Sequence, residues 1–143
     1  MWREIAQLPE GADVRPDRMA RRSFRFPHSS PALWSCKIAE WQKGADGHWQ
    51  MFDLLQEALF VHAENIASLR VLRKYARRCG LDIRAWEHAM SSQAVREAVL
   101  QDQQEAHRWG IFGVPALVIN HQFLLQGELP YQVLRSEILT ATQ

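Results

Sequence analysis

The stretch that decides the fold is residues 110–120, which read Gly-Ile-Phe-Gly-Val-Pro-Ala-Leu-Val-Ile-Asn. Residues 116–119 form a continuous apolar run, which is the pattern of a short strand covered on both faces. Pro115 stands directly before that run, at the first position of the strand, where a residue without a backbone N–H is tolerated. The stretch therefore predicts a tight loop, Gly113-Val114-Pro115, that leads into a buried strand.

A hairpin and a helix are expected after this strand. Asn120-His121 is a two-residue turn in which both residue types tolerate a positive φ, and residues 122–126 are the predicted return strand. Pro130 then opens an amphipathic final helix. Strand character appears only after Phe112, so the expected order is several helices, a β-hairpin and one more helix.

The segment before the loop has the 3.6-residue apolar period of helices. Ser30 is the expected N-cap of the first helix, with Pro31 at its first helical position, and Gly44 ends it. Asp82 is the expected N-cap of a later short helix. Five helices are predicted in all, over about residues 30–44, 47–63, 68–80, 82–90 and 91–109.

Composition excludes several classes of function. The 143 residues are 47% apolar and 23% charged, with a formal net charge of +1, which is typical of one soluble domain. This balance gives no overall attraction to nucleic acid or to an anionic membrane. No apolar run approaches the ~20 residues needed to cross a bilayer. The start lacks the pattern of a secretory signal, so we expect a cytoplasmic protein.

The N-terminal arm of the chain is rich in arginine. Phenylalanines alternate with its basic residues, which is a pattern found in nucleic-acid-binding segments. Nearby acidic residues dilute the positive field, and we favour a segment that packs its Phe24 and Phe26 on the body of the protein. No nucleic-acid partner is therefore predicted. The arginines concerned are Arg15, Arg18, Arg21, Arg22 and Arg25.

The two cysteines, Cys36 and Cys79, are far apart in sequence and form no Cys-x-x-Cys motif. The helix that holds Cys36 is apolar on two sides, which predicts that this thiol is a small buried hydrophobe. Cys79 lies in the last turn of a predicted helix, where the helix dipole opposes a thiolate. The six histidines show no metal-ligand spacing. We therefore predict no catalytic residue, no metal and no cofactor.

The loop Gly113-Val114-Pro115 resembles the cis-proline loop of the DsbA family of thioredoxin-like thiol–disulfide oxidoreductases. Further segments are similar to the helical insertion and to the last strand and helix of that family, so the resemblance covers about residues 27–140. It implies a helix-rich α/β, partial thioredoxin-like fold. The implied divisions are an N-terminal segment (1–26), a helical insertion domain (27–109) and the C-terminal part of the thioredoxin fold (110–143). The similar segments are 27–32, 37–39, 55–60, 65–66 followed by Leu72, 80–82 and 127–134.

The resemblance also implies a binding site. In thioredoxin-like proteins the proline of this loop is cis, and the backbone of the residue before it pairs with an extended substrate. Gly113, Val114 and Pro115 are accordingly the expected substrate-binding residues, for a peptide or a thiol compound. The alternative is an ordinary turn proline that starts a strand.

The chain departs from the family in one important respect. Nothing in it matches the first strand, the Cys-x-x-Cys at a helix start, or the next strand, so it resembles a truncated or degenerate member. Strand 116–119 then lacks its usual sheet neighbour, and an uncovered apolar edge invites pairing with another chain. We expect a homo-oligomer or a partner chain at this edge, unless residues 22–26 act as a substitute strand.

Three functions remain open from the sequence. The leading interpretation is a redox-inactive protein that acts in binding or assembly through the loop or the strand edge. The second is the C-terminal part of a thiol–disulfide oxidoreductase whose catalytic half is supplied elsewhere. The third is a protein similar to glutathione-dependent isomerases or transferases, some of which share the motif at residues 110–115.

Overall fold

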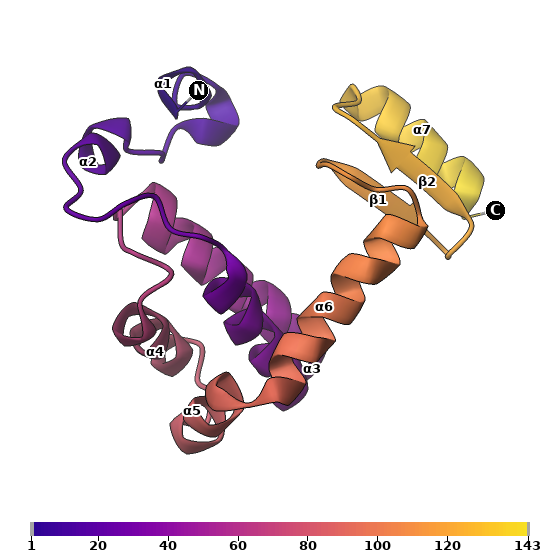
Figure 1. The fold of residues 1–143 in the computed structure, drawn as a ribbon. Coiled ribbons are helices and arrows are strands. Elements are labelled where there is room, and N and C mark those ends of the chain that lie inside the picture. The colour runs from indigo at the N-terminus through magenta and orange to yellow at the C-terminus, as the bar shows by residue number, and fades with distance from the viewer. Residues whose placement is uncertain (1, 143) are drawn as a thin grey trace. The chain divides into compact units, whose positions relative to one another are not determined.

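The computed structural model describes residues 2–142, apart from the side chain of Glu10. The chain divides into two compact units, Met1–Val99 and Leu100–Gln143. The predicted order of helices, hairpin and final helix is confirmed (Figure 1). In chain order the elements are α1 (Trp2–Ile5), a 3-10 turn η1 (Pro9–Gly11), α2 (Pro16–Ala20), α3 (Ser30–Phe60), α4 (Leu69–Arg78), α5 (Ile83–Ser91), α6 (Gln93–Arg108), β1 (Ala116–Ile119), β2 (Phe123–Gln126) and α7 (Tyr131–Ala141).

Helix α3 is folded back on itself at Gly44, where a helix end was predicted. Gly44 has φ 71° and ψ −162°, a backbone region open almost only to glycine. The two halves of α3 lie side by side (Figure 1), and a Cβ on Gly47 would stand 2.5 Å from the Ala39 carbonyl oxygen. The expected N-cap was wrong by one residue, because Ser29 occupies that position and makes no capping hydrogen bond.

The bend of α3 is tied to the connection between α4 and α5. The Gln42 amide accepts a hydrogen bond from the Asp82 N–H (2.8 Å) and donates one to the Asp82 carbonyl (3.2 Å). The Lys43 ammonium donates to the Cys79 carbonyl (2.7 Å) at the end of α4. Asp82 also caps α5 as predicted, since its carboxylate accepts from the Ala85 N–H (2.9 Å). The bend therefore positions α4 and α5 as well as the halves of α3.

The core of the first unit lies where α3 packs against α4 and α5. A buried hydrogen bond crosses it, from the Trp86 indole N–H to the Ser35 hydroxyl (2.9 Å). Ser35 is fully buried, so this bond satisfies two polar groups that have no access to water. The largest fully buried side chains around the pair include Tyr75, Ile38, Met51, Leu72 and Val95.

The N-terminal segment packs on the end of α3. The Arg15 N–H donates to the Phe60 carbonyl (2.9 Å). The Trp2 ring lies against the rings of Phe26 and Phe60, with centroids 5.6 and 4.9 Å away. Residues 22–26 form no strand. The idea that they act as a substitute strand is therefore wrong, and Phe26 instead packs against Trp2.

The second unit is built on the predicted hairpin. Strands β1 and β2 pair antiparallel, with Leu117 opposite Leu125. Asn120 and His121 have φ of 51° and 54°, as expected for their turn. Helix α7 follows the hairpin but has no buried residue among those described.

Strand β1 was expected to be covered on both faces, and within the second unit it is not. Only Ile119 is buried, whereas Leu117 is 39% exposed. The strand and α7 contribute too few side chains to close a core around the hairpin. Apolar residues left exposed in this unit include Phe112, Val114, Phe123, Leu129, Tyr131, Val133 and Leu139.

The Ser35–Trp86 hydrogen bond yields a test of the core. We expect Ser35→Ala to lower the free energy of unfolding by about 1–3 kcal/mol, because it leaves a buried indole N–H without an acceptor. Urea denaturation measures the change. In a Trp86→Phe background there is no indole N–H to lose its acceptor, so Ser35→Ala lowers the free energy of unfolding by less. An equal cost in both backgrounds would show that the bond contributes nothing.

Candidate functional site

The predicted site residues lie in an exposed loop between α6 and β1. The Val114–Pro115 peptide bond is cis, and Val114 is 94% exposed. The loop is joined to β2 because the Gly127 N–H donates to the Pro115 carbonyl (2.9 Å). On its other side, the Phe112 ring stacks on His107 with centroids 5.5 Å apart. Val114 is thus presented to solvent beside a proline whose position is fixed.

The pairing of β1 with β2 determines which backbone groups face outward. Hydrogen-bonded and non-hydrogen-bonded pairs alternate along an antiparallel ladder. The Gly127–Pro115 bond makes Pro115 a hydrogen-bonded position, so Leu117 also points its N–H and C=O toward β2. Ala116 and Val118 point theirs away from β2. In residues 2–142 no backbone partner meets these outward groups, and they form an edge that starts beside the loop.

An apolar depression adjoins the start of this edge. It has a volume of about 330 Å³ and lies between the hairpin and the segment around α7. Pro115, Leu117 and Leu125 line it from the hairpin, Leu129 and Leu134 line it from the segment around α7, and Glu128 also borders it. The mainly apolar lining suits an apolar side chain or a thioether of a bound ligand.

The two thiols take no part in this loop. Cys36 and Cys79 are free, and they are 2% and 1% exposed, within the helical unit. Burial, with a smaller contribution from the nearby Cys79, raises the pKa of Cys36 to about 12. Burial also raises the pKa of Cys79, although the Lys43 ammonium opposes the shift. The predicted burial of Cys36 is confirmed, and burial of both thiols disfavours the thiolate, which is the nucleophilic form.

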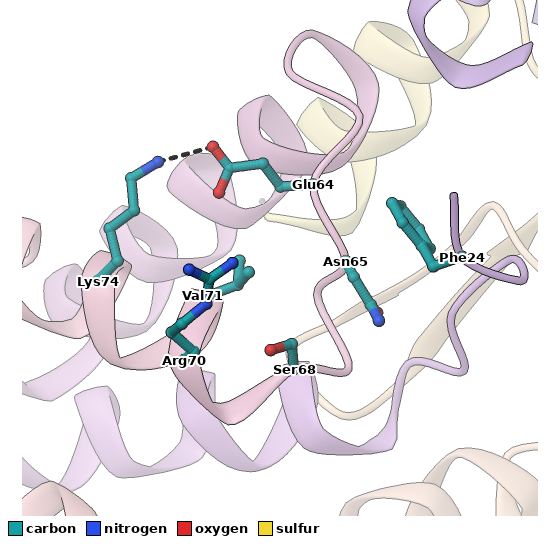
Figure 2. Close-up of a pocket in the computed structure, with 7 residues that line it drawn as sticks. All are labelled: Phe24, Glu64, Asn65, Ser68, Arg70, Val71 and Lys74. Atoms are coloured by element: carbon teal, nitrogen blue, oxygen red, sulfur yellow. Dashed lines mark hydrogen bonds and ion pairs between the residues drawn. The ribbon is translucent and has the colours of Figure 1, made fainter. Parts of the chain in front are cut away.

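Sequence reasoning missed a polar hollow in the helical unit, which Figure 2 shows. It measures about 560 Å³ and lies between Phe24 and the start of α4. Its Glu64 carboxylate accepts from the Lys74 ammonium at 2.6 Å, and this bond raises the pKa of Lys74. The charges of Glu64 and Lys74 thus neutralise each other, while Arg70 also lines the hollow. The lining residues come from segments that no sequence pattern connects.

The described residues contain neither a metal-ion site nor a membrane-spanning helix. No group of three or more His, Cys, Asp or Glu side chains within residues 2–142 is placed to hold a metal ion. In the same part of the chain, no helix is long and apolar enough to cross a bilayer.

Comparison with known proteins identifies the family. A family model for the DsbA-like thioredoxin domain matches residues 23–139. The chain belongs to this DsbA-like family. The predicted helix-rich, DsbA-like α/β fold is therefore confirmed. No curated protein matches the chain.

Solved structures with the same fold are considerably longer than this DsbA-like chain. A protein proposed to be a disulfide isomerase, from Nitrosomonas europaea, has a TM-score of 0.75 at 20% identity, and the match covers 93% of this chain and 74% of that one. The cytosolic disulfide reductase DsbM from Pseudomonas aeruginosa has a TM-score of 0.65 at 20% identity, covering 84% and 65%. DsbM with GSH has a TM-score of 0.66 at 18% identity, covering 96% and 72%.

Burial of the thiols gives a direct prediction. We expect neither cysteine of the native protein to react with DTNB at neutral pH, because both are shielded and protonated. Both react in concentrated guanidinium chloride, which exposes them. Ser91→Cys serves as the control, since Ser91 is exposed and its replacement adds one reactive thiol to the native protein. Rapid reaction of the unsubstituted native protein would contradict the assignment.

Proposed function

We propose that this DsbA-like protein binds an extended polypeptide segment along the outer edge of β1, and that its own cysteines carry out no thiol–disulfide exchange. The observation that carries the proposal is the edge itself. Ala116 and Val118 direct unpaired backbone groups outward from a strand that starts beside the exposed Val114–Pro115 loop. An added strand would satisfy these groups by the same ladder geometry that joins β1 to β2.

The surroundings of the edge support an apolar segment as its occupant. The depression beside Pro115 offers room for one apolar side chain of the bound segment. Phe112 and Val114 are 84% and 94% exposed next to it. A segment with apolar side chains would cover both features while its backbone pairs with β1.

We assign this occupant to a second copy of the chain or to a partner chain. β1 carries no charge, proline or bulge between Ala116 and Ile119, and these are the usual devices that keep an edge from pairing. A peptide or thiol ligand at Gly113, Val114 and Pro115 would use the same surface. We place the protein in the cytoplasm, where cysteines stay reduced and where the similar DsbM acts according to its name.

A matched pair of proline variants tests the edge. Val118→Pro removes an N–H that points away from β2, whereas Leu124→Pro removes one from the opposite edge of the hairpin. Light scattering gives the mass of each variant. If the protein is a dimer, we expect Val118→Pro to shift it to a monomer and Leu124→Pro to leave it dimeric.

If the protein is a monomer, a peptide probe is used to test the same two proline variants. We expect labelled, carboxymethylated insulin B chain to bind, measured by fluorescence anisotropy, and Val118→Pro to weaken it about tenfold. Leu124→Pro retains the affinity. Equal behaviour of the two variants, or a monomer that binds no probe, would refute strand pairing at β1.

The redox part of the proposal has its own assay. The protein should reduce insulin with dithiothreitol no faster than its Cys36→Ser/Cys79→Ser variant, because both thiols are buried and protonated. Turnover above that variant would overturn this part of the proposal and leave the binding part standing.

A second candidate is favoured by the names of the similar structures, which include a disulfide reductase. The chain would then be the part of an oxidoreductase that binds substrate, with the dithiol supplied by another polypeptide. An adjacent reading frame encoding a strand–Cys-x-x-Cys–helix segment would support it. One similar structure contains GSH, so calorimetry with glutathione tests the third, glutathione-dependent interpretation, and absence of binding would dismiss it.

A further inference from the structure

A small apolar pocket lies between the two halves of α3, in the helical unit. Its volume is about 150 Å³. Ala32, Leu33 and Cys36 come from the first half, and Leu55 and Leu59 are among those from the second. None of residues 113–118 takes part, so the pocket is separate from the edge of β1.

The inner wall of the pocket cannot hold water. Ala32, Cys36, Leu55, Leu59 and Ile66 are 7%, 2%, 4%, 6% and 8% exposed. An ordered water needs two or more polar partners, whereas this wall offers only the Cys36 thiol. A dry cavity of about this size is large enough for one benzene ring. The wall therefore suits an apolar group of about six carbon atoms.

The mouth of the pocket adds aromatic and polar features. Phe52 and Phe60 are half-buried at its edge, where ring edges can meet the ring of a ligand. Ser29 and Gln56 complete the lining and are exposed. Within residues 2–142 no hydrogen bond occupies either of these polar side chains, so both can serve a ligand that enters from solvent.

We propose that this pocket binds a small monocyclic aromatic compound with one polar substituent. The ring lies among Leu55, Leu59 and the Cys36 sulfur, which interacts favourably with aromatic rings. The substituent stays at the mouth and bonds with Ser29 or Gln56. A saturated ring of the same size loses the contacts with sulfur and with the phenylalanine rings.

The proposal is tested with benzyl alcohol as the probe, by thermal denaturation of the whole protein. At about ten times its dissociation constant we expect the probe to raise the Tm by about 3–6 °C. Ala32→Leu fills the pocket and removes this shift. Ala20→Leu makes the same substitution at an exposed position of α2 and retains it. An equal shift in both variants, or none in the unsubstituted protein, would overturn the proposal.

Methyl NMR of the unsubstituted protein tests it independently of whether Ala32→Leu folds. We expect shift changes confined to the methyl groups of Leu33, Leu55, Leu59 and Ile66. Changes spread over the molecule would refute a single site. Cyclohexylmethanol defines the chemistry, since binding as tightly as benzyl alcohol would refute the aromatic assignment.

Discussion

The helical unit depends on the reversal of α3 at Gly44 and on the close contact that follows it. Gly44 adopts a backbone conformation that a side chain disfavours, and Gly47 lets the second half approach the Ala39 carbonyl. Once the halves are held together, Gln42 and Lys43 extend from the bend and hydrogen-bond to the connection between α4 and α5. One reversal thus sets the core and creates the pocket between the halves.

The hairpin unit is governed by backbone hydrogen bonding. Each strand of a two-stranded sheet satisfies one edge and leaves the other open, and this hairpin shares its unit with α7 and the end of α6, with no further strand among the described residues. Isolated hairpins are marginal in water, so the exposed apolar side chains and the open edge of β1 point to the same need for a further strand. A segment that pairs with β1, as proposed above, would also supply the cover that the strand lacks, so binding at this edge would stabilise the unit.

Local signals in the sequence predicted local structure well. Gly44 and Asn120-His121 marked reversals because few residue types accept their backbone conformations, and Asp82 marked a helix start through its side-chain oxygen. The apolar run of β1 predicted a strand, but it could not reveal whether this chain covers both faces. The Ser35–Trp86 bond joins residues 51 positions apart, and the pocket arises from the crossing of two helix halves. Neither leaves a periodic pattern in the sequence.

Both cysteines lie in the helical unit, where burial disfavours the thiolate form. A reactive thiol needs exposure and a positive potential that stabilises the thiolate. Cys79 has a cation nearby, yet the Lys43 ammonium donates to the Cys79 carbonyl, and burial outweighs its effect on the thiol. Cys36 is buried in the same apolar core cluster, and its burial raises the pKa of the thiol to about 12. The outward backbone groups of β1, by contrast, are positioned by the hairpin register, and that register is set within the second unit, which contains no cysteine.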